Sequence, residues 1–145
     1  MKFRFVDKIL GVEANRWIEG LKTVSLEEFF ALRPFGVGHL FPPMLMSEAL
    51  FQLGNFLIFK SFGDKLALQL MFRRITIYRH LGPGDVMQMR VELTRVIDDT
   101  VRLDGTGRIN GQTAIKGEGC LAKLVEIERL YDPEKFARYY DSLCG

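Results

Sequence analysis

The stretch Met44–Phe59 is apolar on nearly every side, and it constrains the fold more than any other feature of the chain. Most surface helices have a single apolar face, so a helix that is apolar nearly all round must be surrounded by protein. Pro43 suits the first helical turn, because the N–H that proline lacks has no intrahelical partner there. The sequence therefore predicts a buried helix from Pro43 to about Phe59 or Lys60, with Gly63 beyond its end.

Strand-like residues fill most of the remaining chain, in runs separated by turn signals. Asn110-Gly111 lies between two alternating runs and predicts a tight hairpin. Ser25 with Glu28 three residues later is a capping box and predicts a short helix. Asp132 and Pro133 predict the start of a C-terminal helix. The predicted strands cover residues 3–10, 17–24, 66–78, 86–97, 101–109 and 113–127.

This order of elements predicts an α+β fold, and the short connections favour antiparallel pairing. A curved antiparallel sheet wrapped around the long helix is the simplest way to bury that helix. One sheet cannot cover every side of it, so we expect a partner subunit to cover the rest in an obligate dimer with an apolar interface. We expect a single domain over residues 1–145, with a core at about 3–128 and a C-terminal helix at about 132–143.

Composition excludes several classes of protein. A formal net charge of +2 over 145 residues, with no basic run interleaved with aromatics, argues against a nucleic-acid partner. Cys120 and Cys144 form neither a disulfide framework nor a zinc-ligand pattern. The N-terminus lacks an apolar signal region, and the long helix is short for a membrane span. We therefore expect a cytoplasmic protein without a membrane span.

Three polar side chains interrupt the apolar helix. Glu48, Gln52 and Asn55 stand at i, i+4 and i+7, which places them on one helix face. A carboxylate in apolar surroundings is costly unless it is paired, hydrogen-bonded or protonated. The stripe therefore predicts either a site for proton transfer, or a stripe that faces water at the edge of the sheet or is purely structural.

Several segments together resemble a known family of enzymes. The run 42–52 resembles the central-helix signature M-P-G-V-L-x-x-E-A-x-x-Q of (3R)-hydroxyacyl-acyl-carrier-protein dehydratases. Residues 5–10 resemble the F-L-x-V-D-R-V-L start of that family. Residues 72–74 and 82–85 resemble its F-R-R-P-V-x-P-G-D region, here with extra residues between the two parts. The likeness covers roughly residues 3–127, in order.

The resemblance implies a hotdog fold, in dimers that are sometimes assembled into trimers of dimers. It implies 3-hydroxyacyl substrates held as thioesters on the phosphopantetheine arm of an acyl carrier protein, with no metal or other cofactor. In such enzymes a His of one subunit removes the α-proton, and a Glu or Asp on the central helix of the other protonates the leaving hydroxyl. A backbone N–H at the start of that helix stabilises the thioester oxyanion.

Carried over residue by residue, the resemblance makes Glu48 the catalytic acid, with Gln52 as the helix glutamine. The position of the family's His, 14 residues before the acid, holds Pro34. The Gly whose N–H stabilises the oxyanion is replaced by Pro43, and proline has no N–H. His39, in the same loop as Pro34, is the candidate replacement base, with an ordinary hydrogen-bonded loop histidine as the alternative.

The remaining expectations concern ligands and the reaction. The Phe that follows the family's His is matched by Phe35, and the expected substrate-binding residues are Phe35, Phe41, Pro43, Met44 and Gln52. Arg73 and Arg74 either touch an acidic carrier protein or form a solvated strand face. The first functional hypothesis is a dehydratase of 3-hydroxyacyl thioesters with an altered site. The alternatives are a non-catalytic hotdog subunit that pairs with an active dehydratase, and an acyl-thioester hydrolase.

Overall fold

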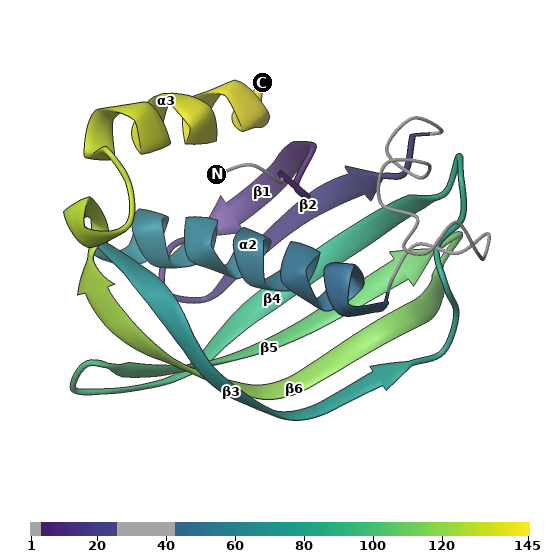
Figure 1. Ribbon diagram of the computed structural model, residues 1–145, viewed down its shortest axis with the longest axis horizontal. Helices are drawn as coiled ribbons and strands as arrows, with labels where there is room; N and C mark the ends of the chain where they lie inside the picture. Colours follow the sequence, from purple (N-terminus) through teal and green to yellow (C-terminus); the bar gives the residue numbers. More distant parts are fainter. Residues whose placement is uncertain (1–3, 26–42) are drawn as a thin grey trace, which may run out of the picture.

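The computed structural model describes residues 4–25 and 43–145. Within these ranges the chain forms a six-stranded sheet, a long helix and a C-terminal helix (Figure 1). The elements in chain order are β1 (Lys8–Glu13), β2 (Trp17–Thr23), α2 (Pro43–Phe62), β3 (Lys65–Ile77), β4 (Val86–Ile97), β5 (Thr100–Ile109), β6 (Gln112–Glu126), the 3-10 turn η2 (Ile127–Arg129) and α3 (Pro133–Cys144).

The sheet is antiparallel throughout, in the order β1-β2-β4-β5-β6-β3. Consecutive strands β4, β5 and β6 are neighbours, whereas β3 crosses over to pair with β6 at the far edge. The turn between β5 and β6 has both Asn110 and Gly111 at positive φ, 51° and 79°. These backbone angles are those of the hairpin turn that this dipeptide predicts.

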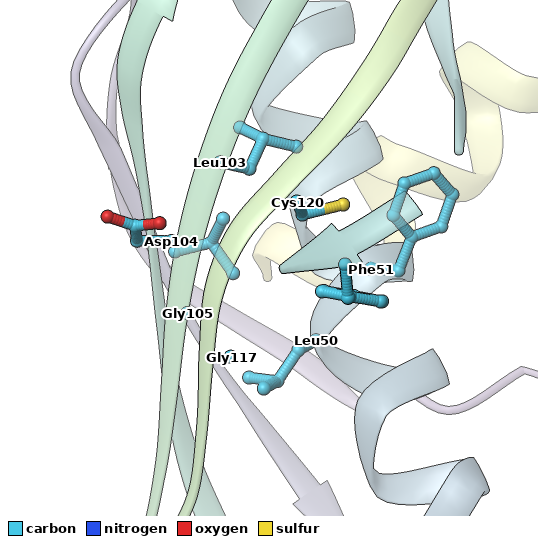
Figure 2. Close-up of a pocket in the computed structure, with 9 residues that line it drawn as sticks. Leu50, Phe51, Leu103, Asp104, Gly105, Gly117 and Cys120 are labelled. Carbon is cyan, nitrogen blue, oxygen red and sulfur yellow. The ribbon is translucent and has the colours of Figure 1, made fainter. Parts of the chain in front are cut away.

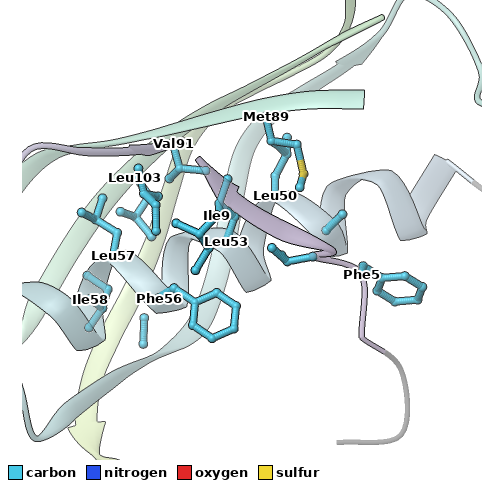
Figure 3. Close-up of a cluster of buried hydrophobic side chains, with 14 of the residues drawn as sticks. Phe5, Ile9, Leu50, Leu53, Phe56, Leu57, Ile58, Met89, Val91 and Leu103 are labelled. Carbon is cyan, nitrogen blue, oxygen red and sulfur yellow. The ribbon is translucent and has the colours of Figure 1, made fainter. Parts of the chain in front are cut away.

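The curved sheet wraps around α2, as the apolar character of the helix predicts (Figure 1). The face of α2 that carries Leu50, Leu53 and Leu57 packs on side chains of β4 and β5, including Val91 and Leu103 (Figure 3). Gly54 lets the helix lie close to the sheet, because a Cβ there would stand 3.2 Å from the Leu103 side chain. This is the hotdog arrangement that the resemblance implies.

The C-terminal helix covers part of the opposite side of α2 (Figure 1). Phe136 stacks on Phe56 with ring centroids 5.4 Å apart and meets Phe59 edge-on at 5.2 Å. Tyr140 adds a third aromatic ring against Phe56, at 5.8 Å. We expected a partner subunit to bury the side of α2 that the sheet leaves free. At the C-terminal half of α2, the chain's own last helix buries part of that side.

The first strand and the long helix have bounds that differ from the predicted ones by more than one residue. The first strand begins at Lys8 and runs to Glu13, instead of covering residues 3–10. Phe5 and Val6 are buried without belonging to a strand, because the segment docks on α2 rather than pairing along the sheet. The long helix continues to Phe62 and ends at Gly63, whose φ of 74° places it in the left-handed conformation that ends many helices.

The short helix expected to start at the Ser25 capping box and to run into Phe29 and Phe30 lies outside the described residues, apart from Ser25. No helix in the part of the chain that the structure describes is long and apolar enough to cross a membrane.

Cys120 and Cys144 are both free thiols, and Cys120 is buried in the core.

Candidate functional site

The polar stripe on α2 lies together, as its spacing predicts, and its three members have different surroundings. Gln52 is buried, whereas Glu48 and Asn55 are half-buried. All three line one hollow between α2, β3 and the segment before α3. The hydrogen bonds of each side chain show which of the three already has a partner within the protein.

Gln52 joins the N-terminal segment to the helix. Its Oε1 accepts a hydrogen bond from the backbone N–H of Phe5 at 2.9 Å. That bond fixes the orientation of the amide, because only its oxygen can accept. The Nε2 atom is thereby turned toward Glu48 and donates to its Oε1 at 3.4 Å. Gln52 therefore anchors the N-terminal segment and orients the Glu48 carboxylate.

Asn55 has a structural partner as well. Its Oδ1 accepts a hydrogen bond from the backbone N–H of Ala67 at 2.7 Å, which ties α2 to the start of the edge strand β3. Both amides of the stripe thus accept from backbone N–H groups, and Glu48 is the member that lines the hollow with a carboxylate.

The hollow has a volume of about 180 Å³ and is mainly apolar. Glu48, Gln52 and Asn55 are the polar side chains that the structure places around it. The apolar part of its lining consists of Phe51, Phe56, Ala67, Leu68, Leu130, Tyr131 and Phe136. We call this hollow the acid cavity. A carboxyl group beside an apolar cavity can hold a polar atom of a ligand whose remaining chain is apolar.

A second, much narrower cavity lies between α2 and the sheet (Figure 2). Its volume is about 20 Å³, room for about one water molecule. Gly105 of β5 and Gly117 of β6 form its floor, and Leu50 and Phe51 approach from the helix. Phe51 lines both cavities, so it forms the wall between them.

Cys120 faces this narrow cavity with its thiol (Figure 2). Burial, with a smaller contribution from the Asp104 carboxylate, raises the pKa of the thiol to about 12. The thiol is thus protonated at neutral pH, and the thiolate is the form that acts as a nucleophile or metal ligand. Cys120 is a buried core residue. No group of three or more potential metal ligands occurs among the described residues.

The other predicted site residues are not brought to the acid cavity by the described structure. His39, Phe35, Phe41 and the Pro34 position lie outside the described residues, and their roles stay predictions. Pro43 begins α2 and is exposed, and Met44 is 82% exposed and does not line the acid cavity.

Arg73 and Arg74 line a separate hollow of about 310 Å³ with Arg102 and Glu118. The hollow spans β3, β5 and β6, so arginines 28 or 29 residues apart in sequence share one surface. Arg102 is also within 3.8 Å of an Asp104 oxygen. Three guanidinium groups around a single lining carboxylate make this surface attractive to anions.

Sequence reasoning did not find the wall of the acid cavity that comes from residues after β6. Leu130 and Tyr131 precede α3, and Phe136 lies in its first turn. The C-terminal helix itself was predicted from Asp132 and Pro133. That its Phe136 packs on Phe56 and lines the acid cavity is a long-range contact, which local sequence patterns do not encode.

Comparison with known proteins places these features in one family. The FabA-like domain family matches residues 1–118. A 3-hydroxyacyl-[acyl-carrier-protein] dehydratase FabZ of Hydrogenobaculum sp. is 35% identical over 116 residues, which cover 74% of this chain and 75% of the relative. The FabZ of Moorella thermoacetica is 31% identical over 128 residues, which cover 87% of this chain and 90% of the relative.

Solved structures agree on the fold. A hot-dog-like protein from Thermanaerovibrio acidaminovorans superposes with a TM-score of 0.64 at 16% identity, covering 92% of this chain and 95% of that chain. A chain of the dehydratase heterocomplex ApeI:P from Xenorhabdus doucetiae superposes with a TM-score of 0.62 at 14% identity, covering 93% and 88%. The fold, the helix signature around Glu48 and the match over residues 1–118 lead to one conclusion: this chain belongs to the FabA-like domain family.

Proposed function

We propose that this chain is a dehydratase-like protein that acts on 3-hydroxyacyl thioesters of an acyl carrier protein, with Glu48 as the general acid. The observation that carries the proposal is the Glu48 carboxylate, which accepts from Gln52 and lines a mainly apolar cavity. The two FabZ relatives, 35% and 31% identical to this chain, are named as dehydratases of this substrate class. An acyl chain requires an apolar cavity, and its 3-hydroxyl requires a proton donor beside that cavity.

The proposed reaction is a loss of water. A base takes the proton from Cα, and the electron pair of that C–H bond forms the Cα–Cβ double bond. The C–O bond at Cβ breaks, and protonated Glu48 gives its proton to the departing hydroxyl, which leaves as water. The substrate is carried on phosphopantetheine, and we propose that the chain uses no metal or other cofactor for this step. We place the reaction in the cytoplasm.

Two groups of the family's mechanism, the base and the oxyanion donor, are replaced by prolines in this chain. Pro34 and Pro43 occupy the two positions where the family's motif has a His and a Gly. Neither residue can supply the missing proton acceptor or N–H. His39 is the base that we propose within this chain, and a partner subunit is the second source of these groups.

Conversion of 3-hydroxyacyl pantetheine thioesters to enoyl thioesters, followed by ultraviolet absorbance, tests the proposal. We expect Glu48→Gln to lower the rate by at least a hundredfold, because the amide has no acidic proton to give. Glu92→Gln is the matched control, since Glu92 is exposed on β4 and pairs with Arg90. A wild-type rate in Glu48→Gln would show that Glu48 is not the acid.

A second candidate function is a subunit that pairs with another hotdog chain, which supplies the groups lost at Pro34 and Pro43. The edge strand β3 supports it, because no strand in the described part of the chain pairs with its outer side. Leu68, Leu70 and Met71 on this strand are 47%, 58% and 53% exposed. An apolar, unpaired edge favours addition of a further strand. The ApeI:P neighbour is a dehydratase heterocomplex, which supports a pairing of this chain with a different chain.

The mass of the purified chain, alone and with a co-expressed dehydratase of the same host, separates the two candidates. Activity of the chain alone, with a dimeric mass, favours the first. Activity that appears only in a mixed assembly favours the second. In either assembly, Met71→Lys places a charge on the β3 edge and is expected to weaken the pairing.

The arginine hollow is the surface that we propose for the carrier protein. Arg73, Arg74 and Arg102 present positive charge, and a carrier protein is acidic, as the resemblance implies. Arg74→Glu is expected to raise KM for a substrate on the carrier protein and to leave KM for the pantetheine thioester unchanged, because only the carrier protein touches this surface. An equal effect on both substrates would contradict this assignment.

A further inference from the structure

The acid cavity has one wall that the family match does not include. The match ends at residue 118, whereas Leu130, Tyr131 and Phe136 line the cavity opposite the edge strand β3. These residues belong to the segment between β6 and the first turn of α3. The shape of the cavity therefore depends on a part of this chain that is additional to the matched domain.

This wall is fixed in place by several contacts. Asp132 caps α3 by accepting hydrogen bonds from the N–H groups of Glu134 and Lys135, at 3.0 and 3.1 Å. Phe136 stacks on Tyr131 with ring centroids 5.5 Å apart and on Phe56 at 5.4 Å. A wall held by a helix cap and stacked rings forms a stable boundary for a ligand, since each contact would have to be lost for it to move.

The cavity runs along the helix, away from the carboxylate. Its helix lining extends from Glu48 to Phe56, eight residues or about 12 Å at the usual rise per residue. A hollow of about 180 Å³ spread along such a length is narrow, and a narrow apolar hollow fits an unbranched chain. Phe56, at the end of its helix lining away from Glu48, stacks on Phe136.

We propose that Tyr131, together with Leu130 and Phe136, forms the end of the acyl channel and sets the length of the unbranched acyl chain that the site accepts. The proposal rests on the proposed function, because it assumes that the chain enters beside Glu48. An acyl chain held with its 3-hydroxyl at Glu48 would reach the aromatic wall with its terminal methyl group. Longer chains would have to displace stacked rings or leave apolar carbons in water.

Binding measured by calorimetry tests this inference. The probes are 3-hydroxyacyl pantetheine amides of four to twelve carbons, in which an amide replaces the thioester so that no reaction follows. We expect the affinity of the wild-type protein to rise with chain length by about fourfold per methylene group, or ~0.8 kcal/mol, until the chain meets the wall. Beyond that length the affinity is expected to stop rising.

Two variants move the wall in opposite directions. Tyr131→Ala enlarges the channel, and the limiting length is expected to increase by at least two carbons. Leu130→Trp narrows it, and the limit is expected to decrease. Leu130 is 41% exposed, so this change is tolerated by the core and keeps the test valid if Tyr131→Ala fails to fold. Tyr78→Ala is the matched control, since Tyr78 is 61% exposed and does not line the cavity.

The outcomes separate the two proposals. If the limiting chain length changes in both variants and not in the control, the result supports Tyr131 as part of the end of the channel. Binding with the same limit in all four proteins overturns the inference and leaves the proposed function intact. An absence of binding for every chain length, in the wild type and in the variants, overturns the proposed function and this inference with it.

Discussion

Replacement of Gln52 by glutamate tests whether the amide of Gln52 and the carboxylate of Glu48 act as one unit. The substitution keeps the shape of the side chain and the oxygen that accepts from the N–H of Phe5. It replaces the donor Nε2, which lies 3.4 Å from Glu48 Oε1, by a second carboxyl oxygen. The pair then consists of two acids in a mainly apolar hollow, where only one can be ionised without a large cost.

The magnitude follows from two independent arguments. Two like charges about 4 Å apart at an effective dielectric constant of ~20 repel by ~4 kcal/mol. Keeping one carboxyl protonated at pH 7, against an ordinary pKa of about 4.3, costs ~4 kcal/mol as well. Because Glu48 is only half-buried, solvent lowers both figures, and we expect a loss of ~2–4 kcal/mol of unfolding free energy at pH 7.

The loss of stability in the variant is expected to depend on pH. Repulsion in the folded variant raises the pKa of the carboxyl introduced at position 52 above its unfolded value, so the folded state binds more protons between about pH 4 and pH 7. Stability of the variant relative to the wild type therefore falls as the pH rises through this window. Below about pH 4 protonation of the introduced carboxyl removes the repulsion, and most of the loss disappears.

Thermal and urea unfolding at pH 4 and pH 7 measure this effect. At pH 7 the variant is expected to melt roughly 5–15 °C below the wild type, with a much smaller difference at pH 4. Gln88→Glu on the exposed face of β4 is the matched control and should change little. The double variant Glu48→Gln, Gln52→Glu has one carboxyl again and should regain stability. A destabilisation that is independent of pH, or that persists in the double variant, would refute the coupling.

Two further predictions concern the C-terminal helix and the core. Asp132→Ala removes the acceptor for the N–H groups of Glu134 and Lys135, so we expect it to lower the free energy of unfolding by about 1 kcal/mol. The melting temperature should then fall by roughly 2–4 °C, and an unchanged melting curve would show that the cap is dispensable. Cys144 is exposed, whereas burial raises the pKa of Cys120 to about 12, so a thiol reagent at pH 8 should modify one thiol rapidly and the second only in denaturant. Two rapid equivalents in the native protein would contradict this assignment.

Much of the fold could be predicted from the sequence because its signals are local. The all-round apolar run after Pro43 predicts a wrapped helix, and Asn110-Gly111 predicts the last hairpin; both are confirmed. The bounds of β4 are those predicted. The first strand was placed too early, because Phe5 is as apolar as a strand residue and its actual partner, Gln52, lies 47 residues away.

The candidate site was predictable only in part, for the same reason. The spacing of Glu48, Gln52 and Asn55 shows that they share a helix face, but not which backbone groups they meet. The partner of Asn55 is the N–H of Ala67 on a strand that crosses to the sheet edge. Tyr131 reaches the cavity because the chain turns back over α2 after β6. Contacts of this kind depend on topology, which a local pattern does not specify.

The difference between the two amides and the carboxylate in the stripe has a physical basis. An amide can satisfy a buried backbone N–H without carrying charge, so Gln52 and Asn55 can be used to tie Phe5 and Ala67 to the helix. A carboxylate in the same place would carry the cost of a buried charge. Glu48, one turn nearer the helix start, is therefore the stripe position where an acid can be kept beside an apolar cavity. It stays half-exposed, and the anchored amide of Gln52 fixes its orientation. That arrangement links the stability of the N-terminal segment to the orientation of the acid, so a change at Gln52 is expected to affect both.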